Sequence, residues 1–235
     1  MSGWGRSLEV ITAAVLLAAV FCRPPASVAE QASIEFISPW PGALVKDGPV
    51  VLAGRLPPEA GQVHFLFNGR PLDGIKRAGA GFSAILEPKK GFNEVEIRFG
   101  DRSSRLTFIY GMRAAGQMPY AFHEPLLENT CRPCHREGRG GSDLTEAAQC
   151  YQCHKAAAVL YSYVHGPIAA GMCLICHDAH GSSLSSLTRM ESKKMCISCH
   201  DQPSTTEHAE SRTRVCTLCH DPHYSMLRYL LKSDY

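Results

Sequence analysis

The stretch CLICHDAH, residues 173–180, and four related stretches determine the fold of the second half of this 235-residue chain. Each of the five contains the pattern Cys-x-x-Cys-His, in which a histidine directly follows the second of two cysteines. Together they use ten of the eleven cysteines of the chain. The cysteine pairs are Cys131 and Cys134, Cys150 and Cys153, Cys173 and Cys176, Cys196 and Cys199, and Cys216 and Cys219. The motif histidines are His135, His154, His177, His200 and His220.

The spacing within the motif has a physical reason that points to covalently attached haem. Two thiols three positions apart on a tight helical turn can reach the two vinyl groups on one edge of a porphyrin. The histidine next to the second thiol then lies under the iron and supplies its proximal nitrogen. The sequence therefore predicts five c-type haems, with the ten motif cysteines as attachment points and the five motif histidines as iron ligands.

Zinc sites and disulfides are the two competing explanations for so many cysteines. Paired Cys-x-x-Cys motifs also build zinc ribbons and knuckles, and exported chains often carry disulfides. Neither arrangement needs a histidine directly after the second cysteine, and that coincidence would have to occur five times. The motifs therefore favour haem over both alternatives.

Five further histidines stand at repeated distances from the motifs and are candidates for the second axial ligand of each iron. His123, His165 and His208 each lie eight residues before the first cysteine of a motif. His180 and His223 each lie three residues after a motif histidine. Five spare histidines for five irons predict bis-histidine coordination of at least four haems, but the spacing does not say which histidine serves which haem. The fallback sixth ligands are Met118, Met172 and Met195.

The motifs also form an internal repeat. The first cysteines of motifs one, three and five lie at positions 131, 173 and 216, which is a period of 42 to 43 residues. The second motif lies between the first and the third, and the fourth lies between the third and the fifth. The first motif has Gly138 where the third and fifth have a histidine, so the ligand set of one N-terminal haem stays open.

From His123 to Tyr235 the chain resembles the doubled Cys-x-x-Cys-His cytochromes, a family of bacterial multihaem proteins. The resemblance implies low-potential, six-coordinate haems packed closely enough for electrons to pass from one to the next, and little regular secondary structure. Size agrees, because five haems in residues 113–235 leave about 25 residues each, too few for a conventional hydrophobic core. Short helices are expected from near Asp143 through Cys150 towards Leu160, and from Ser225 to Lys232.

The first half has a different pattern and no cysteine between residues 23 and 130. Turn residues separate short alternating segments, which fits an antiparallel sandwich. The predicted strands are Ser33–Ser38, Pro49–Arg55, Gln62–Asn68, Phe82–Glu87, Asn93–Phe99 and Arg105–Tyr110. On its strand pattern alone, this half resembles the immunoglobulin-like β-sandwiches of exported bacterial proteins. We expect His64, on an alternating strand, to be a packed or solvent-facing side chain and not a haem ligand.

Three segments are therefore predicted: a secretory signal at residues 1–29, an immunoglobulin-like sandwich at 30–112 and a five-haem cytochrome c domain at 113–235. The signal consists of Arg6, a mostly apolar stretch from Val10 to Phe21 and a small-residue cleavage pattern. Cleavage would make the protein periplasmic or extracellular and leave no membrane span, whereas an uncleaved segment would anchor it in the membrane. Without residues 1–29 the formal charge is 22 − 21 = +1, which argues against a nucleic-acid partner.

The function expected from these features is electron transfer between redox partners, among them an outer-membrane or surface complex, with no chemistry on a substrate. The alternative is a multihaem reductase, in which one iron keeps an open face for a small oxyanion. In a third hypothesis, compatible with the first, the sandwich is a module that docks onto a partner or onto another copy of the chain.

Overall fold

The computed structural model describes residues 33–124, 131, 134, 135, 146–154, 160–201, 208 and 214–233. All ten motif cysteines and all ten candidate haem-ligand histidines fall within these ranges, whereas the predicted signal at 1–29 lies outside them. In the described part of the chain, no helix is both long and apolar enough to span a membrane.

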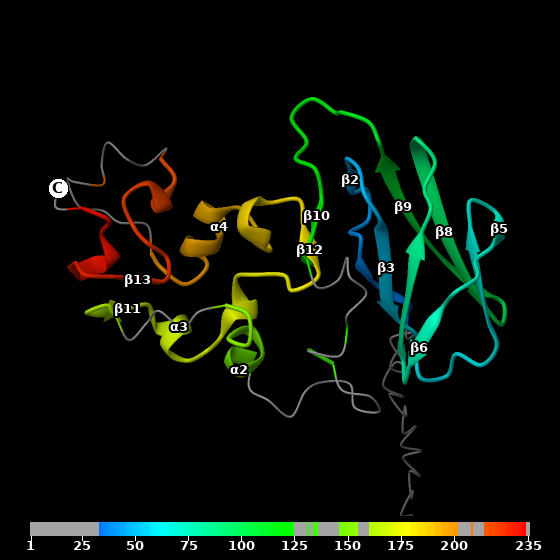
Figure 1. The fold of residues 1–235 in the computed structure, drawn as a ribbon, viewed down its shortest axis with the longest axis horizontal. Coiled ribbons are helices and arrows are strands. Elements are labelled where there is room, and N and C mark those ends of the chain that lie inside the picture. The colour runs from blue at the N-terminus through cyan, green and yellow to red at the C-terminus, as the bar shows by residue number, and fades with distance from the viewer. Residues whose placement is uncertain are drawn as a thin grey trace, which may run out of the picture. The chain divides into compact units, whose positions relative to one another are not determined.

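Nine strands between Glu35 and Tyr110 form two sheets whose inner faces share one hydrophobic core (Figure 1). The first sheet has the order β1 (Glu35–Ser38), β3 (Val50–Arg55), β7 (Gly81–Leu86) and β6 (Lys76–Ala78). The second has the order β2 (Leu44–Val45), β9 (Arg102–Tyr110), β8 (Gly91–Phe99), β4 (Val63–Phe67) and β5 (Arg70–Pro71). All neighbours are antiparallel except β2 and β9. This is the immunoglobulin order, in which strands A, B, E and D form one sheet and C, F and G the other.

All six predicted strands are present, with ends shifted by a few residues. Turn residues separate the strands as predicted: Asn68 and Gly69 both have positive φ between β4 and β5, and Gly100 has positive φ between β8 and β9. Sequence reasoning missed β2, β5 and β6, which have two or three residues each. A segment that short shows no alternation of polar and apolar residues to recognise.

The sandwich core follows the period of two expected for strands with one buried face. Val95 and Ile97 of β8, and Leu106 and Phe108 of β9, are completely buried while their neighbours along β9 face outward. The buried hydrophobic residues among those described all lie between Ile34 and Tyr120. The described residues of the motif-bearing half therefore form no comparable protein core, which agrees with the size argument made above.

One buried polar side chain, Asn93 of β8, fixes the turns around it. Its amide nitrogen donates to the carbonyl oxygens of Lys89 (2.7 Å) and Gly91 (3.0 Å). Its amide oxygen accepts from the backbone of Lys89 (2.9 Å) and the side chain of Asn68 (3.0 Å). These bonds satisfy the buried amide and join the start of β8 to the β4–β5 turn.

We expect Asn93→Ala to lower the free energy of unfolding by about 2 kcal/mol, because it removes three part-buried hydrogen bonds to the backbone of Lys89 and Gly91 and one to Asn68. The matched control is Phe92→Ala, one residue earlier, where the larger side chain is 73% exposed and its loss should cost about 0.5 kcal/mol or less. Urea denaturation followed by circular dichroism measures both. A larger loss from Phe92→Ala would contradict this account.

The described part of the second half contains only short elements. Its helices are α2 (Glu146–Cys150), α3 (Gly166–Ala169) and α4 (Ser192–Ile197). Its 3₁₀ turns are η2 (Cys173–Ile175), η3 (Ser185–Leu187), η4 (Cys216–Leu218) and η5 (Arg228–Leu230). Two two-stranded sheets pair β10 (Ala121–Phe122) with β12 (Gly181–Ser182) and β11 (Tyr163–Val164) with β13 (Tyr224–Ser225).

Two helix predictions need correction here. The helix expected from Asp143 towards Leu160 ends at Cys150, where the chain enters a turn; parts of that range lie outside the described residues. The helix expected from Ser225 to Lys232 is wrong. That segment contains only η5, with Tyr229 and Leu230 in the left-handed region (φ 57° and 56°). Its apolar residues have helical spacing, but the segment has the same fold as residues 182–189, with left-handed residues at matching positions.

Candidate haem-binding site

Each of the five motifs forms one tight turn. The backbone N–H of the motif histidine donates to the carbonyl of the first cysteine at 2.8 to 3.1 Å in all five. The N–H of the second cysteine donates to the same carbonyl at 3.2 to 3.3 Å. Helical geometry places residues three apart on one side of a turn, so both thiols of a motif can approach one porphyrin edge.

Every motif histidine lies opposite one of the five spare histidines. The ring centroids of each pair are 5.9 to 6.1 Å apart and the ring planes differ by 9° to 31°. The pairs are His135 with His180, His154 with His123, His177 with His223, His200 with His165, and His220 with His208. The structure thus supplies the pairing that spacing left open.

The distance fits one metal ion between two imidazoles. A metal–imidazole bond is about 2 Å long, and a ring centroid lies about 1 Å behind its nitrogen, so two axial imidazoles should have centroids about 6 Å apart. Aromatic pairs in general spread over about 4.5–7 Å and many angles. Five pairs within 0.2 Å of one another therefore indicate a common cause.

The pairing follows the repeat. A histidine that stands eight residues before one motif faces the histidine of the motif after that one. His123, before the first motif, faces His154 of the second, and His165, before the third, faces His200 of the fourth. A histidine after a motif faces the motif two places earlier, as His180 faces His135 and His223 faces His177. A histidine in place of Gly138 would have no earlier motif of this sequence to face, so the first haem lacks no ligand on that account.

The fifth pair departs from this rule. His208 stands before the fifth motif, but it faces His220 of that same motif. The two residues are 12 positions apart, whereas His135 and His180 are 45 apart. The pair of His208 and His220 is therefore formed by one motif and the residues just before it.

The two-stranded sheets hold four of the spare histidines in place. The N–H of His123, directly after β10, donates to the carbonyl of His180, directly before β12, at 3.0 Å. The N–H of His165, directly after β11, donates to the carbonyl of His223, directly before β13, at 2.9 Å. Each sheet therefore fixes the candidate distal ligands of two successive haems.

Hydrogen bonds to ring nitrogens orient the imidazoles. Nδ1 of His177 lies 2.8 Å from the carbonyl oxygen of Ser186, and Nδ1 of His220 lies 2.7 Å from that of Tyr229. Nδ1 of the spare histidine His165 lies 2.9 Å from the carbonyl of Pro222. Donation from Nδ1 leaves Nε2 as the free nitrogen, which is the arrangement of metal-bound histidines.

Left-handed residues aim these carbonyls at the motif histidines. Ser186 and Leu187 have φ of 56° and 53°, and the equivalent Tyr229 and Leu230 have nearly the same values. This conformation costs roughly 1–2 kcal/mol per non-glycine residue. Its occurrence at matching positions of both repeats indicates that the hydrogen bonds from these carbonyls to the motif histidines compensate for the strain.

Burial affects the pKa values of several site residues. It lowers the pKa of His123, His135 and His223, and the facing imidazole lowers each further. These histidines therefore favour the neutral form that binds iron. Burial raises the pKa of Asp178, but hydrogen bonds from His180 and Gly181 outweigh it and the net pKa is lowered.

The motifs follow one another in space. Burial raises the pKa of the Cys134, Cys176 and Cys196 thiols, and nearby thiols of Cys153, Cys199 and Cys216, respectively, raise it further. The thiols of motifs one and two, three and four, and four and five therefore lie near one another. Motifs two and three meet where α2 contacts η2 and the side chain of Ala147 lies against Gly171.

The competing explanations find no matching geometry in the described residues. The ten motif cysteines are all free thiols. Within the ranges given above, no cluster of three or more histidine, cysteine, aspartate or glutamate side chains is arranged to hold a bare metal ion. The repeated feature is a pair of opposed imidazoles beside a two-thiol turn, and a c-type haem fits that donor set.

Tyr120 connects the sandwich to the first of the two-stranded sheets. It is buried, and its N–H donates to the carbonyl of Leu44 in β2 at 2.6 Å. Its ring packs edge-on against Trp40 and Phe122, with centroids 5.8 and 5.1 Å away. Burial raises the pKa of its hydroxyl. The next residue begins β10, so the sandwich core anchors the strand that leads to His123.

Gly181 of β12 makes room for this connection. A Cβ added at Gly181 would lie 2.6 Å from the carbonyl oxygen of Ala121 and 2.7 Å from the ring of Tyr120. In the second repeat the equivalent residue is Tyr224, which stacks on Tyr161 with centroids 4.2 Å apart. The glycine is therefore required where the first repeat meets the sandwich.

We expect Gly181→Ala to lower the free energy of unfolding by about 1–3 kcal/mol through overpacking. Gly61→Ala is the control, because no atom lies within 4 Å of the added Cβ and the backbone there has no positive φ. Thermal unfolding of the mature protein measures both variants. Equal melting temperatures for the two would contradict the tight contact between Gly181 and Tyr120.

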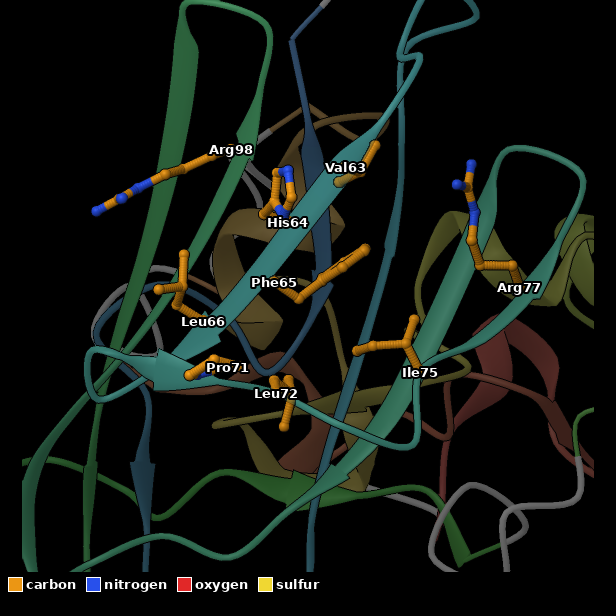
Figure 2. A pocket seen from close by; sticks show the side chains of 9 residues that line it. All are labelled: Val63, His64, Phe65, Leu66, Pro71, Leu72, Ile75, Arg77 and Arg98. Atoms are coloured by element: carbon orange, nitrogen blue, oxygen red, sulfur yellow. The ribbon is translucent and has the colours of Figure 1, made fainter.

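The sandwich has a pocket of its own, with a volume of about 580 Å³. Figure 2 shows Phe65 and Ile75 extending into the space between β4 and the segment before β6. His64 lines this pocket from β4 and is exposed, as expected of a residue that is not a haem ligand. The remaining lining residues are Val63, Leu66, Pro71, Leu72, Arg77 and Arg98.

Comparisons with known proteins agree with the motif analysis. Residues 165–205, which contain the third and fourth motifs, match the model of the family described as doubled CXXCH motif. The match indicates a multihaem c-type cytochrome, with haem bound covalently at the CXXCH motifs. No curated protein matches the chain.

Three similar solved structures each cover about a third of the chain. An "IG27 protein domain" is 20% identical, covers 34% of this chain and 94% of its own, and has a TM-score of 0.27. Domain I10 from titin is 10% identical, with 33% and 98% covered and a TM-score of 0.26. I81 from titin is 11% identical, with 33% and 95% covered and a TM-score of 0.26. The immunoglobulin-like assignment rests on the strand order.

Proposed function

We propose that this protein is an exported electron carrier that holds five c-type haems, each with two histidine ligands. The observation that carries the proposal is the set of five opposed imidazole pairs at one common distance. Haem iron would supply one-electron redox chemistry, and the axial ligands and their hydrogen bonds would set its potential. The chain's own part is to bind, orient and bring the haems together.

The contacts between successive motifs support electron transfer along the chain of haems. Successive motifs lie near enough for their thiols to affect one another's pKa, and α2 contacts η2 and α4 contacts η4. Attached porphyrins would then lie near one another in sequence order from the first motif to the fifth. Electrons could enter at one haem and leave at another without any substrate being transformed.

The reductase alternative needs an iron with an open face. All five motif histidines are described, and each faces another imidazole. No observation therefore favours that alternative over the carrier. Export rests on the predicted signal at residues 1–29, and the partners we propose are other redox proteins in the periplasm or at the cell surface. Docking through the sandwich, to a partner or to a second copy, is compatible with this role.

The proposal is tested by the haem content and electron capacity of the mature protein. A pyridine haemochrome assay with the intact mass should give five haems per chain, and a reductive titration should consume five electrons. Steady-state assays with nitrite or a sulfur oxyanion should show no turnover. Fewer haems would overturn the five-haem count, and turnover would favour the reductase.

The assigned pairs predict which substitution opens an iron. His208→Ala should leave the haem count unchanged but convert one haem of five to a high-spin state, because His208 faces His220 of the fifth motif. His64→Ala is the matched control and should leave every haem low-spin, because His64 lies exposed on β4. Visible and magnetic circular dichroism spectra report the spin state. An unchanged spectrum for His208→Ala would contradict the assigned pair.

A further inference from the structure

An aspartate directly follows the motif histidine in three of the five motifs. These residues are Asp178, Asp201 and Asp221. In the third and fifth motifs a spare histidine stands two positions after the aspartate, at His180 and His223. In the fourth motif Pro203 occupies that place. The chain therefore contains two aspartates next to a spare histidine and one without, which makes a natural comparison.

The two aspartates form the same turn at both places. Oδ1 of Asp178 accepts from the N–H of His180 at 2.9 Å and from that of Gly181 at 3.4 Å. Oδ1 of Asp221 accepts from the N–H of His223 at 2.8 Å and from that of Tyr224 at 3.3 Å. A carboxylate that bonds the backbone two residues on is an Asx turn, which fixes the local chain direction.

The backbone of each aspartate is held as well. The N–H of Asp178 donates to the carbonyl of Leu187 at 2.8 Å, and that of Asp221 donates to the carbonyl of Leu230 at 2.7 Å. Leu187 and Leu230 belong to the left-handed segments that also orient the motif histidines. The turn therefore starts from a fixed backbone, and the carboxylate fixes where it ends.

The turn joins ligands of two different haems. His177, before Asp178, faces His223, whereas His180, after it, faces His135. His220, before Asp221, faces His208, whereas His223, after it, faces His177. The side chain of Asp178 is only 15% exposed, whereas Asp201 is exposed. A solvated surface aspartate would need neither this burial nor the repeated bonds.

We infer that Asp178 and Asp221 are positioning residues that hold the distal histidines His180 and His223 at bonding distance from the irons of the first and third motifs. The inference rests on the proposed bis-histidine haems and adds the residues that keep two of them closed. Neither aspartate touches a haem iron in this account; each acts through the histidine that follows it two positions on, by its backbone N–H and, at Asp178, also by Nδ1 of His180, 3.7 Å from the carboxylate.

The test is carbon monoxide binding to the reduced, full-length mature protein, because carbon monoxide binds only an iron that has lost a ligand. Asp178→Ala and Asp221→Ala should each take up carbon monoxide at up to one haem per chain. Asp178→Asn should bind little or none, because an amide oxygen can still accept both backbone bonds. Asp201→Ala, the matched control, should behave as the wild type and bind none.

The outcomes separate this inference from the proposed function. Carbon monoxide binding by the wild type would contradict the closed irons themselves. A closed wild type with equally closed Asp178→Ala and Asp221→Ala variants would overturn the positioning role alone. Equal opening by Asp178→Asn and Asp178→Ala would also overturn it, because charge and not the turn would then matter. If Asp178→Ala matures with fewer haems, Asp178→Ser, whose hydroxyl is a weaker acceptor, should show intermediate binding at full haem content.

Discussion

In the function proposed above, the second half of the protein would depend on one interaction, the ligation of a single iron by two imidazoles from separate parts of the chain. His135 and His180 are 45 residues apart, and His177 and His223 are 46 apart. Each such iron would close a long loop, as a disulfide does in a small exported domain. Because no hydrophobic side chain described beyond Tyr120 is buried, haems and their ligands must stabilise what a protein core cannot.

The first half is stabilised differently, by ordinary strand pairing and a hydrophobic core. The two halves meet where Tyr120 packs into that core and the next residue starts β10. In the second repeat the corresponding place is filled by the stacked pair of Tyr161 and Tyr224. The sandwich thus takes the position of a preceding repeat, the role that a capping unit has in repeat proteins.

Much of this could be predicted from local sequence, and the remainder depends on contacts between distant residues. The strands β1, β3, β4, β7, β8 and β9 and the cysteine motifs carry short-range patterns. The facing pairs have no such pattern, because His135 and His180 are 45 residues apart, and the sheets that hold four of the spare histidines join residues about 60 positions apart. The repeat of 182–189 at 225–232 was visible as a 43-residue period, since Ser182 and Ser225 each precede a leucine by two positions, but apolar residues at helical spacing concealed it.

The most direct test of the account is low-temperature electron paramagnetic resonance of the oxidised wild-type protein, with the haem concentration measured on the same sample. Two imidazoles on every iron predict low-spin ferric signals that account for all five haems. The small angles between facing rings, 9° to 31°, further predict ordinary rhombic spectra and not the highly anisotropic kind that perpendicular rings produce. A high-spin signal equal to one haem or more would contradict the central claim.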